Sequence, residues 1–297
     1  MLASHAVASV IVVNWNAGAA LGRCLASLDA DAATGAEIVV VDNASEDGST
    51  AAACAGRPWV RQLPQPANRG FAAGANAGAA VATGDVLVFL NPDAAVEPGA
   101  IHGLAATLLA TPGAAIAGGG LRDETGRWQP GAARFGVVAH LLLDTTPGRL
   151  VARGRRAPHR VDWVYGTFMA VRRSAFEALG GFDGAYFLYG EDLDLCHRAA
   201  AAGWTTIHVP DARATHGRNV SATARFGLGR DAAVVAGELR FYARRRGASA
   251  ARAYRALASA KFGAKAMVAT LAGRRETARR AAGVVRLCIG RSDEVPA

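Results

Sequence analysis

The stretch SVIVVNWN, residues 9–16, places four consecutive β-branched residues directly before a polar end. Two similar stretches follow, AEIVVVDNAS at residues 36–45 and GDVLVFLNPDA at residues 84–94. Continuous Val, Ile and Leu runs without alternating polar residues are typical of strands that are covered on both faces. Segments with helical spacing, residues 17–30 and 71–83, separate these runs. The pattern therefore predicts an α/β fold with a mostly parallel sheet flanked by helices.

These three predicted strands all end in polar residues, namely Asn14 and Asn16, Asp42, and Asn91 and Asp93. Ligands of parallel sheets bind beyond such strand ends. The Asp42 carboxylate suits either a cap for the following helix or a hydrogen bond to the N–H edge of a pyrimidine base. Asp93 suits either a turn or a divalent cation held against a pyrophosphate, because such ions prefer carboxylate oxygens.

Glycine recurs at every fourth position of the second helical segment, at Gly70, Gly74 and Gly78. This spacing leaves one helix face almost without side chains. A bare face permits close helix packing. With Asn68 and Arg69 just ahead of the helix, it also permits close approach of a phosphate-bearing ligand.

The pattern of strands and helices weakens after the first 115 residues, where a loop or hairpin and a connector at residues 140–160 are expected. A strand and a helix that begins at Ser174 are expected next. A further helix is predicted from Glu191 to about Ala202, with a strand at residues 205–210 after it. The last sixty or so residues are helical in pattern, alanine-rich and basic.

Three acids, Glu191, Asp192 and Asp194, occupy four positions at the start of the predicted helix. Negative charge is favoured there by the helix dipole, and capping alone explains one or two of these residues. A third acid increases the mutual repulsion, which a nearby cation or a bound proton would relieve. A carboxylate whose pKa is raised in this way is what a general base requires.

The histidine and cysteine residues give one candidate metal ligand. The four cysteines are scattered without CxxC spacing, so we expect reduced, buried thiols in a cytoplasmic protein. His216 follows the last predicted strand, and a single histidine is most often structural. It becomes a ligand only where the fold brings it to Asp93, a mixed ligand set that suits Mg²⁺ or Mn²⁺.

The net charge of +9 comes from the C-terminal part of the chain. Residues 236–297 contain 14 Lys and Arg against 4 Asp and Glu, whereas residues 1–235 contain 19 against 20. This asymmetry argues against a nucleic-acid-binding protein. The sequence shows neither a signal peptide nor the run of about 20 apolar residues that a membrane-spanning helix needs.

The motifs SVIVVNWN, VVVDNAS, NRGFAAGANAG, LNPDA, the block VDWVYGTFMAVRRSAFEALGGFDGAYFLYGEDLDLCHR and HVPDARATHGRNVS occur in order over residues 8–222. Together they resemble the family 2 glycosyltransferases of the GT-A fold, in particular the rhamnosyltransferase-like group. The resemblance implies a Rossmann-like glycosyltransferase domain at residues 1–235 and a basic helical tail at residues 236–297. The nucleotide-sugar half would extend to about residue 115, and the acceptor half would follow from residue 116.

The resemblance also implies inverting transfer of a sugar from a nucleotide diphosphate sugar, with Mg²⁺ or Mn²⁺ as cofactor. The residues that would hold the donor are Val13, Asn14, Asn16, Asp42, Asn68, Gly70 and Asn76. Asp93 matches the last acid of the family's metal-binding DxD triplet. The first position of that triplet is Asn91 here, which shifts more of the metal binding onto His216.

On the acceptor side, the resemblance points to Trp163 and Gly166. The acids of the GED motif match the family's catalytic block, with Asp192 as the expected general base and Glu191 as the alternative. Asp194 would position the loop or an acceptor hydroxyl.

The partners implied by the resemblance are a saccharide or lipid-linked acceptor of cell-envelope polysaccharide synthesis, with dTDP-rhamnose as donor. A basic tail is either a solvated helix surface or a means of docking on the anionic inner face of the plasma membrane. A homo-oligomer is compatible with this reading. A non-catalytic nucleotide-sugar-binding or scaffold subunit is the alternative, whereas the absence of GxGxxG after the first strand argues against a dinucleotide enzyme.

Overall fold

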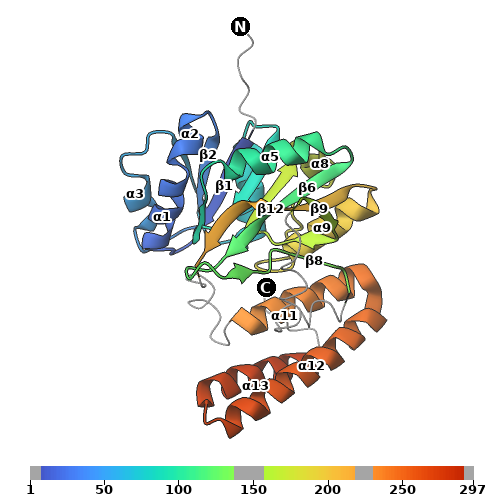
Figure 1. The fold of residues 1–297 in the computed structure, drawn as a ribbon. Helices are drawn as coiled ribbons and strands as arrows, with labels where there is room; N and C mark the ends of the chain where they lie inside the picture. The colour runs from blue at the N-terminus through green and yellow to red at the C-terminus, as the bar shows by residue number, and fades with distance from the viewer. Residues whose placement is uncertain (1–7, 137–156, 218–229, 291–297) are drawn as a thin grey trace.

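The computed structural model describes residues 8–136, 157–217 and 230–290. Its centre is one large sheet with the strand order β3-β2-β1-β4-β11-β6-β12-β5 (Figure 1). The first four strands are parallel: β3 (Val60–Pro64), β2 (Glu37–Asp42), β1 (Ala8–Asn14) and β4 (Val86–Leu90). Their carboxyl ends therefore lie at one edge of the sheet, as the sequence predicted.

Helices cover both faces of the sheet, so alternate residues of each central strand enter different hydrophobic cores. Val10 and Val12 face α1 (Ala19–Ser27) and α5 (Ala100–Ala110). Ile11 and Val13 face α4 (Gly70–Val81) on the opposite side. Two short helices, α2 (Asp29–Ala33) and α3 (Ser49–Cys54), complete the first half. This two-sided burial is the reason why the strands read as continuous apolar runs.

The second half of the sheet mixes strand directions. β11 (Phe168–Arg172) is antiparallel to both of its neighbours, β4 and β6 (Ala114–Arg122). β12 (Thr205–His216) runs parallel to β6, and the edge strand β5 (Ala94–Val96) is antiparallel to β12. The strand expected at residues 205–210 is thus twice as long, since it continues through a register shift between Val209 and Arg213.

β6 is a regular buried strand that contains a run of glycines. The expectation that regular structure weakens after the first 115 residues is therefore wrong for this segment. A Cβ on Gly118 would lie 2.4 Å from the Cβ of Val164, and one on Gly119 would lie 2.2 Å from the Phe168 ring. A Cβ on Gly120 would lie 2.4 Å from the Pro210 carbonyl oxygen. The glycines therefore let neighbouring residues pack closely against a buried strand, although a run of glycines in a sequence suggests a break in regular structure.

Shorter elements surround the sheet: β7 (Trp128–Gln129), β8 (Ala132–Ala133), β9 (His159–Val161), β10 (Trp163–Val164) and α8 (Arg173–Ala178). α9 (Glu191–Ala201) begins and ends as predicted, within one residue. The connector expected at residues 140–160 lies mostly outside the described residues.

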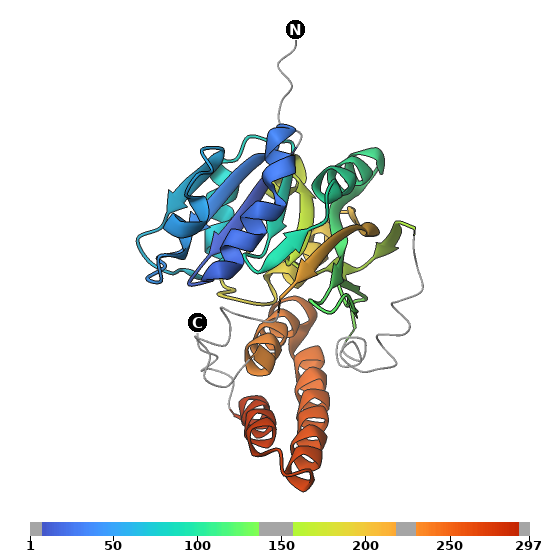
Figure 2. The same cartoon turned by 60° about the vertical axis from the view of Figure 1, so that its left-hand side comes forward.

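The C-terminal helices form a layer of their own beside the sheet domain (Figures 1 and 2). They are α11 (Arg230–Phe241), the π-helical turn η1 (Tyr242–Arg246), α12 (Gly247–Leu271) and α13 (Arg275–Ile289). The position 235/236, expected as the start of the tail, lies inside α11. α11 shares a hydrophobic core with α4 and α9, while α12 and α13 form a hairpin that extends away from the sheet (Figure 2). None of the described helices combines the length and the apolar character needed to cross a bilayer.

Candidate active site

The carboxylate of Asp93 and the imidazole of His216 lie together at the edge of the sheet. Asp93 Oδ1 is 3.4 Å from His216 Nε2, and each side chain is 12% exposed. The pairing of β5 with β12 produces this contact, because it sets His216 opposite Ala94, the residue after Asp93. The proximity that sequence spacing left open is therefore present in the fold.

Gln129 orients the imidazole of His216. The Gln129 side chain donates from Nε2 to the His216 carbonyl oxygen at 3.2 Å, and its Oε1 lies 3.3 Å from His216 Nδ1. The Nε2 side of the ring faces Asp93, as in a metal-binding histidine with an oriented outer partner.

The donor set of this pair fits a hard divalent cation. Two ligand atoms that share an octahedral ion at about 2.1 Å lie about 3 Å apart, close to the separation of Asp93 Oδ1 and His216 Nε2. Within residues 8–136, 157–217 and 230–290, no group of three or more His, Cys, Asp or Glu side chains is arranged to hold a metal. A cation here would depend on oxygens from the ligand as well as on the protein.

Asp192 lies in the first turn of α9 with its carboxylate held by two backbone donors. The Gly166 amide donates to Oδ2 at 2.8 Å, and the Leu193 amide donates to Oδ1 at 2.7 Å. Burial raises the pKa of Asp192 to about 6, even though these two bonds favour the ionised form. The side chain is half-buried, so it combines a fixed position with access to a ligand.

Glu191, the preceding residue, is only 5% exposed. Its Oε2 has no hydrogen-bond partner among the described residues. Burial, and next the charge of Asp192, raise the pKa of Glu191 well above its usual value. Burial thus raises the pKa of both neighbouring carboxyl groups.

Backbone contacts connect the acidic turn with the Asp93–His216 pair. Gly166, which donates to Asp192, is followed by Thr167, whose carbonyl oxygen accepts from the Asn91 amide at 3.0 Å. The Asn91 side chain also lies 3.5 Å from Thr167 Oγ1. Tyr189 gives a second connection, since the charges of both Glu191 and Asp93 raise the pKa of its hydroxyl, after the larger effect of burial.

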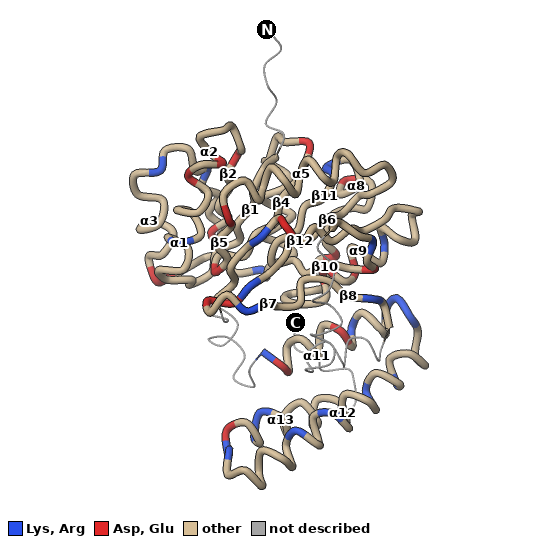
Figure 3. The backbone as a smooth tube through the Cα atoms, viewed as in Figure 1, with Lys and Arg blue, Asp and Glu red and all other residues tan. Residues whose placement is uncertain are grey.

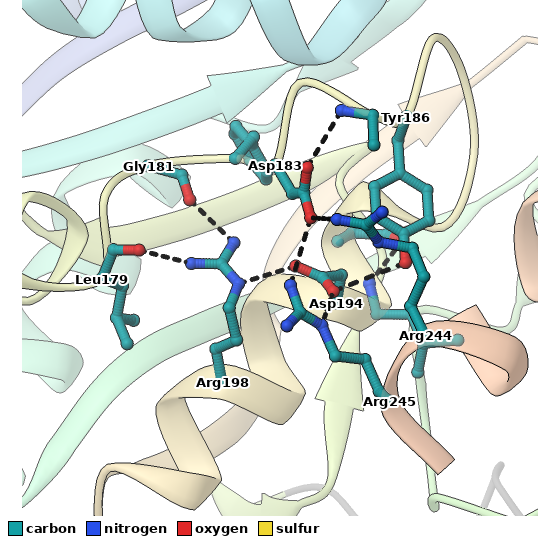
Figure 4. Close-up of polar contacts among 12 residues, drawn as sticks. Leu179, Gly181, Asp183, Tyr186, Asp194, Arg198, Arg244 and Arg245 are labelled. Carbon is teal, nitrogen blue, oxygen red and sulfur yellow. Dashed lines mark hydrogen bonds and ion pairs between the residues drawn. The ribbon is translucent and has the colours of Figure 1, made fainter. Parts of the chain in front are cut away.

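Of the two roles expected for Asp194, positioning the loop or positioning an acceptor hydroxyl, the contacts in the structure suit the first. Its carboxylate is fully buried between two guanidinium groups, 2.6 Å from Arg198 Nε and 2.6 Å from Arg245 Nε (Figure 4). Arg198 also donates to the carbonyl oxygens of Leu179 and Gly181, at 2.6 and 2.7 Å. An acceptor contact is excluded by this burial. Asp194 holds the loop that precedes α9.

The polar residues at the ends of β1 and β2 are bonded mainly to one another. Nδ2 of the buried Asn14 lies within hydrogen-bond distance of the hydroxyls of Ser45, Ser49 and Thr50, at 3.1, 2.9 and 2.8 Å. Asp42 Oδ1 accepts from the Ser45 amide at 3.0 Å, which forms a turn and not the cap of α3. Asn14 therefore shapes the loop at residues 43–48, and the half-buried Asp42 stays next to it.

Asn16 belongs to the same loop: its Oδ1 accepts from the Glu46 amide at 2.8 Å. It is one of three non-glycine residues with a positive φ in the described part of the chain, at 50°. Val13 is buried, and a Cβ on Gly74 would lie 2.8 Å from its Cγ1. Val13 thus forms the wall against which α4 packs, next to the expected donor residues.

Close packing explains the bare face of α4. A Cβ on Gly70 would lie 2.2 Å from the Phe187 carbonyl oxygen, which accepts from the Phe71 amide. Asn68 Oδ1 accepts from the Gly70 amide at 2.9 Å and from the buried Asn43 side chain at 3.0 Å. Gly70 and Asn68 therefore join the donor half to the loop that leads into α9.

Asn76 is a correction to the expected donor pocket. Its Oδ1 accepts from the Phe182 amide, and its Nδ2 donates to the Phe182 carbonyl oxygen, both at 2.9 Å. These bonds satisfy the side chain on the loop at residues 181–183 and give it a structural role. Trp163, expected on the acceptor side, is also buried, and its ring centroid lies 4.6 Å from that of Tyr165.

Sequence reasoning missed Gln129, Asn43 and Arg245. Asn43 directly follows Asp42 at a strand end, a position that already predicted function. Gln129 and Arg245 carry no local signal, because their partners lie 87 and 51 residues away in the chain.

Comparisons with known proteins identify the family of the chain. The family model described as Glycosyl transferase family 2 matches residues 9–180. N-acetylglucosaminyl-diphospho-decaprenol L-rhamnosyltransferase of Mycobacterium tuberculosis (strain ATCC 25618 / H37Rv) is 34% identical over 232 residues, 71% of this chain and 76% of the relative. Rhamnosyltransferase WbbL of Escherichia coli (strain K12) is 50% identical over 56 residues, 19% of this chain and 21% of that protein.

Two solved structures share the fold at low sequence identity. The mannosyltransferase PcManGT from Pyrobaculum calidifontis, in complex with GDP-Man and Mn²⁺, has a TM-score of 0.61 and 18% identity, over 97% of this chain and 88% of that chain. GalNAc-T7 with UDP, GalNAc and Mn²⁺ has a TM-score of 0.58 and 17% identity, over 80% of this chain and 48% of that chain. The sheet and its flanking helices are thus a GT-A fold, and the chain belongs to glycosyl transferase family 2, in its rhamnosyltransferase-like group.

Proposed function

We propose that this glycosyltransferase performs inverting transfer of a sugar from a nucleotide diphosphate sugar to a hydroxyl group of a saccharide or lipid-linked acceptor. The connection of the Asp93–His216 pair to Asp192, through Gly166 and Thr167, carries the proposal. The Asp93–His216 pair suits a diphosphate with its cation, and Asp192 suits an attacking hydroxyl. A displacement at the sugar carbon between them needs both groups fixed in one site.

Asp192 is the proposed general base. Its ionised carboxylate takes the proton of the acceptor hydroxyl as that oxygen forms a bond to the anomeric carbon. The bond between that carbon and the diphosphate oxygen breaks, and its electron pair leaves with the nucleoside diphosphate. Because attack and departure occur on opposite faces of the sugar, the configuration inverts. A pKa of about 6 suits this role near neutral pH.

Glu191 supports the base by staying neutral. A second negative charge beside Asp192 would raise the pKa of Asp192 further and leave less of the base ionised. Burial raises the pKa of the Glu191 carboxyl well above its usual value, which favours the protonated form. We therefore assign the proton transfer to Asp192 and not to Glu191.

Asp93 and His216 are the proposed protein ligands of Mg²⁺ or Mn²⁺. When bound, such an ion stabilises the negative charge that develops on the leaving diphosphate. Gln129 orients the imidazole so that Nε2 faces this site. Thermal unfolding with UDP or dTDP tests the assignment without turnover: Mn²⁺ should strengthen nucleotide stabilisation of the wild type and not of His216→Ala.

The proposed donor is dTDP-rhamnose, and the proposed acceptor is a polyprenyl diphosphate-linked saccharide of cell-envelope polysaccharide synthesis. The Mycobacterium tuberculosis relative, named as a rhamnosyltransferase acting on a diphospho-decaprenol acceptor, supports this choice. A panel of nucleotide sugars with Mn²⁺ tests it by release of nucleoside diphosphate, with Asp192→Asn as control. No turnover of any donor by the wild type, combined with metal-dependent nucleotide binding, would favour a non-catalytic subunit.

The C-terminal hairpin suggests where the acceptor is met. Val268 and Leu271 of α12 are 61% and 82% exposed, and Leu257, 42% exposed, lies on the same helix face. Residues 247–289 contain nine Lys and Arg and one acid, and Figure 3 shows these basic residues along α12 and α13. An apolar stripe with basic flanks is typical of helices that lie in an anionic membrane surface. We include peripheral docking on the inner face of the plasma membrane in the proposed function.

Cosedimentation with vesicles tests the docking. Wild type should bind vesicles that contain phosphatidylglycerol and not pure phosphatidylcholine vesicles, and the double variant Val268→Asp/Leu271→Asp should lose this binding. Unchanged binding would remove the hairpin from the proposal. Light scattering is the matched control, because a dimer lost in the double variant would assign the stripe to a second copy of the chain.

A further inference from the structure

The C-terminal helices reach back into the acidic turn at the start of α9. Arg245 Nε lies 2.6 Å from Asp194 Oδ1, and Arg245 Nη2 lies 3.1 Å from Asp183 Oδ2 (Figure 4). Arg244 pairs with the same Asp183 oxygen at 3.0 Å. Arg198 occupies the other side of Asp194 (Figure 4). Two acids and three arginines thus form one network. Within it, Arg245 contacts Asp194 and Asp183, which lie 51 and 62 positions earlier in the chain.

Backbone packing reinforces the same junction. A Cβ on Gly237 of α11 would lie 2.2 Å from the Tyr189 carbonyl oxygen, so α11 contacts this turn directly. Tyr189 and Gly190, just before α9, both have positive φ values, 69° and 91°. A turn in this sparsely populated conformation needs support from its surroundings. Arg240 adds to that support by donating to the Ala185 carbonyl oxygen.

The π-helical turn η1 sets the direction of the two arginines. Residues 242–246 form a single π-helical turn between α11 and α12, the kind of irregularity that is rare and concentrated at functional sites. Its wider turn changes the angular position of each side chain relative to a continuous α-helix. Arg245 is consequently directed at Asp194, while Tyr242 is buried in the core.

We propose that Arg245 is a positioning residue for the transfer reaction. It neutralises Asp194 and ties the loop at residues 183–190 to the C-terminal helices, so that Asp192, two residues before Asp194, stays fixed. This role rests on the proposed function for its effect on turnover, but not for its structural effect. It also makes η1 part of the catalytic domain and not of a separable tail.

Turnover of dTDP-rhamnose, or of whichever donor the panel identifies, measures the functional side. Arg245→Gln should lower kcat about 10- to 100-fold with the donor KM almost unchanged, because Asp192 is misplaced while the Asp93–His216 end is intact. Arg245→Lys should recover part of the loss through its contact with Asp194. Arg244→Gln is the matched control, since its exposed ion pair reaches only Asp183, and it should keep kcat within about twofold.

Hydrogen exchange, followed by mass spectrometry of the peptides over residues 183–195, measures the structural side without any substrate. Arg245→Gln should exchange about tenfold faster there than wild type or Arg244→Gln. Should Arg245→Gln fail to fold, the same comparison with Arg245→Lys decides. Exchange equal to wild type, or a rise in KM that matches the whole loss, overturns the positioning role. A wild type without turnover would instead count against the proposed function alone.

Discussion

The acidic turn of α9 and the loop before it contain two pairs of acids in opposite electrostatic surroundings. Asp183 and Asp194, the anchored acids, are neutralised by three arginines. Glu191 and Asp192, the reactive acids, have no Lys or Arg partner among the described residues. The same residue types therefore serve structure in one pair and proton transfer in the other.

The difference teaches that burial alone does not mark a catalytic carboxylate. Asp194 and Glu191 are both buried, yet the reactive acids lack a compensating cation, and burial raises their pKa values. A buried acid that is paired with arginine serves as an anchor. Variants of one acid from each pair test the distinction between the anchored and the reactive acids.

The largest expected effect is the loss of turnover in Asp192→Asn. An amide of the same shape keeps the contact with Gly166 and removes the base, so kcat should fall about 10²- to 10⁴-fold. Nucleotide stabilisation in thermal unfolding and the midpoint of denaturant unfolding should stay close to wild type. A variant that transfers sugar at the wild-type rate would show that Asp192 is not the base.

Asp194→Asn should mainly lower stability, with a loss of turnover no larger than that of Arg245→Gln, because both variants break the same contact. The neutral side chain leaves Arg198 and Arg245 without their shared carboxylate in a buried site, which costs about 3 kcal/mol in the free energy of unfolding. Urea denaturation followed by circular dichroism measures this, with the exposed pair variant Arg244→Gln as control. Loss of turnover at full stability would place Asp194 among the reactive acids and abolish the distinction.

Much of this arrangement could be predicted from local sequence. The apolar runs of β1, β2 and β4 and the acids at the start of α9 have the period or composition of the elements that they form. Their polar ends predicted the position of the site, since parallel strands place their carboxyl ends at one edge. From the sequence, His216 could be named as a metal ligand only on the condition that the fold brings it to Asp93.

The parts that escaped prediction depend on contacts between distant segments. The three-residue strand β5 has no periodicity of its own, and it exists because β12 continues past its bulge to pair with it. In the sequence, Arg245 cannot be distinguished from the other arginines of the basic helical segment. Its contact with Asp194 depends on η1. Gly118 and its neighbours read as a break because the side chains that need their space come from β10 and β11.

The pH dependence of turnover also separates the two pairs of acids, and the expected effect is smaller. Asp192 has a pKa raised to about 6, and only its ionised form accepts a proton. The value of kcat/KM should therefore be at its plateau above that pH and fall about tenfold for each unit below it. Asp183 should not contribute a second step in this range, since the Ala185 amide and its two arginine partners outweigh burial and lower its pKa. A profile flat down to pH 5 would contradict the assignment.

The smallest expected effect belongs to Glu191→Gln, and it separates the two reactive acids from each other. If Glu191 keeps its proton at neutral pH, glutamine reproduces its size and its neutral state, so kcat at pH 7.5 should stay within about threefold of wild type. The apparent pKa of kcat/KM should move slightly lower, because the partial repulsion of Asp192 by the ionised fraction of Glu191 is removed. Measurement of both variants in parallel is decisive: a loss in Glu191→Gln as large as that in Asp192→Asn would mean that Glu191 works as an ionised group. The proton would then belong to Asp192, and the two carboxyl groups would exchange their roles.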